Sequence, residues 1–181
     1  SKEKYMYNYF CFNKAFLWKK DKKRDSLKIL KNKYKEYRSN WHSIPRNSFI
    51  EKRGSEELKK LNLPPQCIDI ETASICDLAC PFCFREYIAT PDKIISKKLC
   101  YSLIDQAADL GVPSIKFNWR GEPLLHPNLP EFIAYAKKKG ILETLINTNA
   151  TTLTKEKSIQ LIESGLDIMI YSFDGAKKKT Y

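Results

Sequence analysis

The stretch SIKFNWRGEPLLHPNLPEFIAYAKKKGILETLINT, residues 114–148, contains the unit that decides the fold. It opens with the β-type run SIKFNW, passes through NLPEFIAYAKKKG, which reads as a helix ending at Gly140, and closes on the β-type run ILETLINT. A strand, a helix and a second strand in succession predict a right-handed βαβ unit with parallel strands. The stretch therefore predicts an α/β fold.

The same alternation continues on both sides of this unit. The further runs are CIDIET (67–72), SKKLCYSLIDQAADLG (96–111), TKEKSIQLIESG (154–165), DIMIYSF (167–173) and AKKKTY (176–181). Ser96 and Thr154 are expected N-caps, and Gly111 and Gly165 are expected helix ends. Four strands within residues 66–181 predict a parallel sheet, either the first half of a partial (β/α)6 TIM-like barrel or a doubly wound sheet.

The polar and unusual residues follow the predicted strands. The segments are ICDLACPFC after the first strand, RGEPLLHP after the second, NTNATT after the third and SFDG at the end of the fourth. The carboxyl ends of parallel strands meet at one edge of a sheet, which we call the rim, and α/β folds bind ligands there. We therefore expect one site built from these four segments.

Three cysteines lie close together in ASICDLACPFCFRE, residues 73–86. Cys76, Cys80 and Cys83 are too near one another for a sensible disulfide framework, so a metal or redox centre is the better interpretation. Thiolates are soft ligands that favour zinc or iron–sulfur clusters. Three protein ligands with one open position are typical of a reactive centre.

The segment CDLACPFC resembles the CxxxCxφC signature of the radical S-adenosylmethionine enzymes, with Phe82 as the aromatic residue before the last cysteine. The resemblance implies a 4Fe–4S cluster held by Cys76, Cys80 and Cys83, with S-adenosylmethionine chelating the fourth iron. It implies that the reduced cluster cleaves this cofactor to a 5′-deoxyadenosyl radical, which abstracts hydrogen from the substrate. No catalytic side chain beyond the cluster ligands is assigned.

The other rim segments resemble the same family. RGEP looks like its GGEP motif, with Arg120 in place of the first glycine, and the resemblance places Gly121, Glu122 and Pro123 at the amino group of the methionine portion. The backbone of Phe82 is expected near the adenine. The polar positions near the ribose and the methionine carboxylate are matched by Asn147, Asn149, Ser172 and Asp174.

Residues 1–62 differ in composition from the rest. They carry 18 Lys and Arg against 7 Asp and Glu, whereas residues 63–181 carry 14 of each. We predict a basic, mainly helical extension over 1–62 and the radical enzyme core over 63–181. The aromatic residues of a helix capped by Asp25 or Ser26 and stopped by Pro45 should pack on the main body. A second short helix is expected around SEELKKL, residues 55–61.

The resemblance to a branch that often carries a C-terminal auxiliary-cluster (SPASM-type) domain implies a peptide or carbohydrate-type substrate and a reducing partner such as flavodoxin or ferredoxin. No apolar run approaches the roughly 20 residues that span a bilayer, so we expect a cytoplasmic protein. Two alternatives remain. The basic extension would suit an RNA-modifying radical enzyme. A non-catalytic domain stapled by zinc could draw a fourth ligand from Cys67, Cys100 or His126.

Overall fold

The structure is a computed structural model that describes residues 24–49, 63–89, 91–173 and 175. The predicted helices around residues 55–61 and 176–181 lie outside this part of the chain. No helix in the described ranges has the length and apolar character needed to cross a lipid bilayer.

The sheet has four parallel strands in the order β1 (Ile68–Asp69), β2 (Ser114–Lys116), β3 (Glu143–Thr148) and β4 (Ile168–Tyr171). Each strand pairs with the next one in the sequence. A doubly wound sheet reverses its strand order at a switch point, whereas a (β/α) barrel adds strands consecutively. The observed order confirms the half-barrel prediction, although β1 and β2 are shorter than the runs that predicted them.

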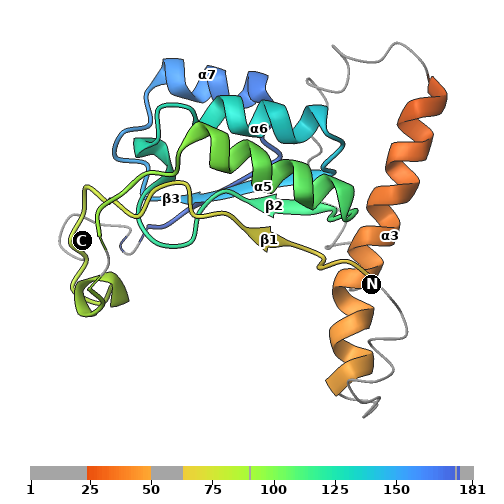
Figure 1. Cartoon of the computed structure of the whole chain (residues 1–181), viewed down its shortest axis with the longest axis horizontal. Coiled ribbons are helices and arrows are strands. Elements are labelled where there is room, and N and C mark those ends of the chain that lie inside the picture. The colour runs from red at the N-terminus through yellow and green to blue at the C-terminus, as the bar shows by residue number, and fades with distance from the viewer. Residues whose placement is uncertain (1–23, 50–62, 90, 174, 176–181) are drawn as a thin grey trace.

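The helices α5 (Lys97–Asp109), α6 (Leu129–Lys138) and α7 (Lys155–Ser164) all lie on one face of the sheet (Figure 1). Alternate strand residues point toward them, and Ile115, Phe117 and Ile146 are fully buried there. The expected caps are confirmed. Ser96 accepts a hydrogen bond from the backbone N–H of Leu99, and Gly165 ends α7 with φ of 91°.

The residues between these core positions point to the opposite face. The helices α5, α6 and α7 leave this face uncovered (Figure 1), and in a closed barrel it would be the interior. A cavity of about 640 Å³ opens here against the helix α3 (Arg24–Phe49), at the end of the sheet opposite the rim. Its lining residues are Tyr37, Arg38 and Trp41 of α3, Cys67 and Asp69 at β1, Lys116 of β2, and Glu143, Leu145, Ile168 and Ile170 of β3 and β4.

The helix α3 (Arg24–Phe49) crosses the sheet at the end opposite the rim (Figure 1). The hydroxyls of Tyr34 and Tyr37 donate to the two carboxylate oxygens of Glu143, at 2.6 and 2.8 Å. Glu143 is the first residue of β3 and is buried, as are both tyrosines. Burial and the nearby Glu143 carboxylate raise the pKa of both phenols, so they remain donors. Tyr34 and Tyr37 thus pack on the main body as predicted, whereas Trp41 stays 40% exposed.

Two expected boundaries of α3 are wrong. The helix begins at Arg24, so Asp25 and Ser26 lie inside its first turn, and it continues through Pro45 to Phe49. Proline removes one hydrogen bond to the residue four positions earlier and crowds that carbonyl. Because Pro45 lies about one turn from the end, the loss falls on the final turn alone, while docking on Glu143 holds the preceding turns.

Candidate functional site

The cysteine segment forms a loop whose two ends are paired like strands. Ala73 and Ile94 form an antiparallel bridge, and Ser74 N–H donates to the carbonyl of Lys93 at 2.9 Å. The N–H of Ile95 donates to the carbonyl of Thr72 at 2.9 Å. The loop from 75 to 92 is therefore closed at its base, directly after β1.

Arg85 strengthens this closure from inside the loop. Its Nε donates to the carbonyl of Ser74 at 2.9 Å, and its guanidinium pairs with Asp92. Glu86 lies 3.8 Å away as a weaker partner. The contacts of Arg85 thus tie the two arms of the loop together.

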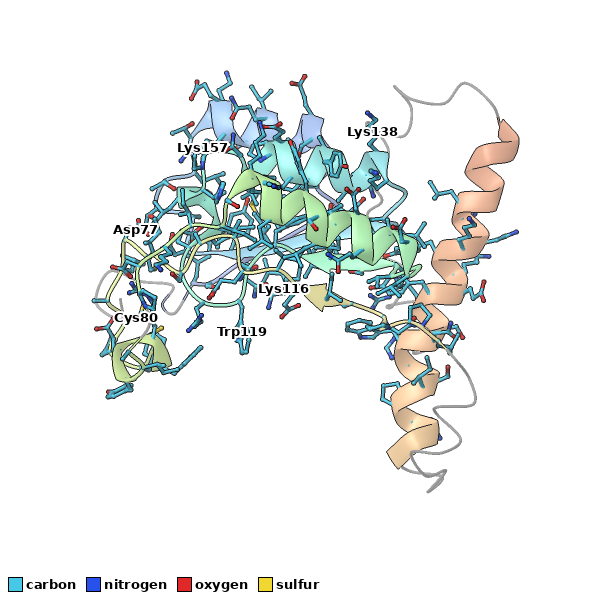
Figure 2. All side chains as sticks on the ribbon, in the orientation of Figure 1. Asp77, Cys80, Lys116, Trp119, Lys138 and Lys157 are labelled. Atoms are coloured by element: carbon cyan, nitrogen blue, oxygen red, sulfur yellow. The ribbon has the colours of Figure 1, made fainter. Side chains whose placement is uncertain are left out.

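The three cysteines are free thiols and partly exposed. The N–H of Cys83 donates to the carbonyl of Cys80 at 2.9 Å, which folds these two residues into a tight turn before the short helix η1 (Phe84–Tyr87). Burial, with the negative charges of Asp77 and Glu122, raises the pKa of the Cys76 thiol. Figure 2 shows Asp77 and Cys80 at the end of the molecule far from α3.

The donor set of this loop bears on the metal that it suits. Thiolates are soft ligands that favour zinc or iron–sulfur clusters. In a 4Fe–4S cluster each cysteine binds a different iron, and three cysteines leave the fourth iron open. Three partly exposed cysteines on one loop therefore fit a cluster, and their assignment as its ligands stays a prediction.

The proposed fourth ligands for zinc are engaged elsewhere. Cys100 is fully buried under α5, where burial raises its thiol pKa to about 12. Cys67 precedes β1, at the opposite end of the strand from the loop. His126 is buried, with Nε2 3.0 Å from the carbonyl of Ile95 and Nδ1 accepting from Asn128 N–H at 3.1 Å.

The RGEP segment lies directly against the base of the cysteine loop. Gly121 has φ of 62°, and a Cβ placed on it would lie 2.4 Å from the carbonyl oxygen of Ala73 and 2.5 Å from that of Ile75. The N–H of Glu122 donates to the Ile75 carbonyl at 2.8 Å. Only glycine permits this approach, which joins the two loops just before Cys76.

Glu122 has a buried carboxylate that accepts three hydrogen bonds within the protein. Its Oε1 accepts from Leu124 N–H at 3.0 Å and from the hydroxyl of Thr148 at 2.6 Å, and its Oε2 accepts from Asn149 N–H at 2.8 Å. The side chain is only 2% exposed. Pro123 follows it, also buried, at the start of the 3₁₀ turn η2 (Pro123–Leu125). The carboxylate therefore braces the loop after β3, and its contact with a bound cofactor stays a prediction.

Arg120, which stands where the family has glycine, pairs with Glu71 at the end of β1. Its Nε and Nη2 donate to the two carboxylate oxygens at 2.7 and 2.6 Å, and its backbone N–H donates at 3.1 Å. The side-chain hydrogen bonds from Arg120 hold the pKa of Glu71 below its usual value. The pair links the carboxyl ends of β1 and β2.

The loop after β3 carries the two predicted asparagines. The N–H of Asn147 donates to Asn118 Oδ1 at 2.8 Å. The side-chain oxygen of Asn147 is buried and has no hydrogen-bond partner in the described part of the chain. Because buried polar atoms are rarely left unpaired, this oxygen is suited to a donor on a bound cofactor.

Asn149 faces the cysteine loop instead. Its side-chain nitrogen donates to Asp77 Oδ1 at 2.9 Å, and the hydroxyl of Thr151 donates to the other oxygen of that carboxylate. Partial burial of Asp77 raises its pKa, but these hydrogen bonds outweigh burial and lower it. Asp77 and Thr151 were missed in the sequence. An acidic residue directly after the first cysteine was the available signal.

For three further predicted positions the structure shows no contact that bears on a cofactor. Phe82 lies on the cysteine loop with its ring 69% exposed. Ser172 follows β4, where its N–H donates to the carbonyl of Thr148 at 2.9 Å. Asp174 lies outside the described residues. The roles assigned to these residues stay predictions.

Comparison with known proteins agrees with this arrangement. A family model described as the Radical SAM superfamily matches residues 70–181. GTP 3′,8-cyclase of Chlorobaculum tepidum is 33% identical over 115 residues, covering 63% of this chain and 34% of that protein. PqqA peptide cyclase of Xanthomonas euvesicatoria is 36% identical over 86 residues, covering 47% and 23%. The chain thus spans about a third or less of these relatives.

A solved structure is also similar. The crystal structure of BtrN in complex with AdoMet and 2-DOIA matches with a TM-score of 0.56 and 28% identity, over 63% of this chain and 48% of that one. Proteins of the matching family bind a 4Fe–4S cluster and S-adenosylmethionine.

Proposed function

Because the chain belongs to the radical SAM superfamily, we propose that it holds a 4Fe–4S cluster through Cys76, Cys80 and Cys83 and uses it to cleave S-adenosylmethionine. The observation that carries the proposal is the docking of Gly121 on the base of the loop that bears the three free thiols. When bound, the cluster and its cofactor would supply an electron and a 5′-deoxyadenosyl radical that abstracts hydrogen from a substrate.

The chain's own residues would position these groups. The closed base of the cysteine loop would fix where the thiolates stand, and Arg85 would limit movement of its two arms. The Oε2 of Glu122, which accepts one hydrogen bond from Asn149 N–H, would accept a second one from the ammonium group of the methionine portion. The unpaired oxygen of Asn147 would accept a further donor, such as a ribose hydroxyl.

We propose a peptide or carbohydrate-type substrate and a branch of the superfamily with an auxiliary-cluster domain. Two observations support these substrate classes: PqqA peptide cyclase is named for a peptide, and BtrN was solved with 2-DOIA. A small reducing protein such as flavodoxin or ferredoxin would deliver the electron.

Anaerobic reconstitution tests the proposal. We expect about four irons and four sulfides per chain, and formation of 5′-deoxyadenosine when dithionite and S-adenosylmethionine are added. Cys80→Ala should lose iron and this product. Cys67→Ala removes a thiol outside the loop and should keep both.

Two outcomes of the reconstitution would contradict the proposal. Zinc bound at one equivalent with no iron–sulfur absorption would overturn the proposal in favour of a zinc-stapled domain. Equal iron loss in Cys67→Ala and Cys80→Ala would also contradict the assignment of the ligands.

A further inference from the structure

Asn149 connects three segments of the rim: its own loop after β3, the RGEP loop and the cysteine loop. Its backbone N–H donates to Glu122 Oε2 at 2.8 Å, which ties it to the RGEP loop. Its side-chain nitrogen donates to Asp77 Oδ1 at 2.9 Å and lies 3.9 Å from the sulfur of Cys76, within the range of an N–H···S hydrogen bond. Asn149 therefore contacts the first cysteine and the residue after it at once.

The orientation of this amide is fixed by its other partners. The side-chain oxygen of Asn149 accepts from Thr151 N–H at 3.0 Å. A flipped amide would set its NH₂ against this N–H and its oxygen against the Asp77 carboxylate. Because both changes are unfavourable, the nitrogen must face Asp77 and Cys76.

We propose that Asn149 is a positioning residue that donates a hydrogen bond to the Cys76 thiolate and thereby raises the reduction potential of the cluster bound there. This inference rests on the proposed function, and it assigns Asn149 to the thiolate instead of to the nucleoside. Reduction adds one electron and places more negative charge on the cluster and its sulfur ligands. A donor aimed at one of these sulfurs stabilises the reduced form more than the oxidised form.

The test is a reductive titration of the anaerobically reconstituted protein with dithionite as the electron source, followed by electron paramagnetic resonance. In Asn149→Ala the donor is lost. We expect the ratio of reduced to oxidised cluster at a fixed potential to fall about tenfold, which corresponds to about 59 mV for a one-electron couple.

Two controls separate the hydrogen bond from general damage. Thr151→Val removes the hydrogen bond from Thr151 to Asp77 and keeps the side-chain nitrogen of Asn149. The reduction potential of this variant should change by less than a third of the shift expected for Asn149→Ala. Asn128→Ala removes an asparagine at the start of α6, away from the loops, and should leave the potential unchanged. If Asn149→Ala does not fold, Asn149→Ser keeps a short polar side chain, removes the amide nitrogen and adds no charge beside Asp77.

If neither Asn149 variant folds, a measurement on the unaltered protein still tests the inference. When the asparagine side chains are labelled with ¹⁵N, pulsed electron paramagnetic resonance of the reduced cluster should detect coupling to a ¹⁵N nucleus. Absence of that coupling, or an unchanged potential in a folded Asn149 variant that holds its four irons, would overturn the inference while leaving the proposed function intact. Failure of the unaltered protein to take up a cluster would instead overturn the proposed function.

Discussion

The α-carbon of Gly121 stands so close to the carbonyl oxygen of Ala73 that no side chain fits between them. A Cβ at position 121 would approach that oxygen to 2.4 Å and the carbonyl carbon of Ser74 to 2.8 Å. The obstructing atoms belong to the backbone, which leads within three residues to the first cysteine. The placement of the three cysteines thus depends on a glycine from another loop.

Gly121→Ala should therefore destabilise the protein and disturb the cysteine loop. Steric overlap costs about 1–3 kcal/mol, and the left-handed backbone adds about 1–2 kcal/mol. We expect the midpoint of thermal unfolding to fall by roughly 5–15 °C and the iron content after reconstitution to drop. Calorimetry of the apo protein and iron analysis check both.

Gly140→Ala is the matched control for this prediction. Gly140 has φ of 95°, but an added Cβ would meet nothing within 4 Å. The Gly140→Ala variant should lose only about 1 kcal/mol of unfolding free energy, from conformational strain, and should keep the iron content of the unaltered protein. Equal effects of the two substitutions would contradict the steric argument.

Glu122→Gln should destabilise the apo protein before any cofactor is added. The new NH₂ would face either the N–H of Asn149 or the donors at the other oxygen, leaving a buried donor unpaired at a cost of about 1–3 kcal/mol. Urea unfolding of the apo protein measures this change. Glu86→Gln, at a side chain 44% exposed, should change stability by less than about 0.5 kcal/mol. Unchanged apo stability in Glu122→Gln would show that the carboxylate does not act as a brace.

The pairing of Glu71 with Arg120 should make stability depend on pH in the acid range. Because the folded protein lowers the pKa of Glu71 below its ordinary 4.5, the stabilising effect is fully present above that value and is lost as pH falls through the lowered pKa. A double-mutant cycle of Glu71→Gln and Arg120→Gln should give a favourable coupling at pH 7 that decreases as pH falls below 4.5. A coupling that does not change with pH in the acid range would contradict the ionic pairing.

Tyr37→Phe should loosen α3 from the sheet. The change removes a hydroxyl that donates to the buried Glu143 carboxylate, at an expected cost of about 1–3 kcal/mol. Urea unfolding measures the loss. Tyr87→Phe, at a side chain 80% exposed, is the control and should cost less than about 0.5 kcal/mol. An unaffected Tyr37→Phe variant would contradict the docking of the helix.

The sheet and its helices could be predicted because their signals are local. Ser96 and Thr154 each accept a hydrogen bond from the N–H three residues later, as their positions before apolar runs indicated. Parallel order followed from the alternation of strands and helices. The end of α3 could not be predicted, because the contacts of Tyr34 and Tyr37 with Glu143 join residues more than 100 positions apart.

The site was predictable in composition but not in its contacts. The three cysteines and the RGEP segment were identified from their spacing, yet the part played by Glu122 inside the protein depends on donors from Thr148 and Asn149. The partner of Arg120 was likewise hidden, since Glu71 lies 49 residues away. Contacts between loops are set by how the strands align, which local patterns do not encode.

Anchoring α3 to the starts of the strands has a consequence for inheritance. Natural variants near Glu143 would alter how much folded protein a cell accumulates and leave the cysteine loop unchanged. Variants at Gly121 or Glu122 would alter abundance and chemistry together, so the two ends of the molecule are inherited under different constraints.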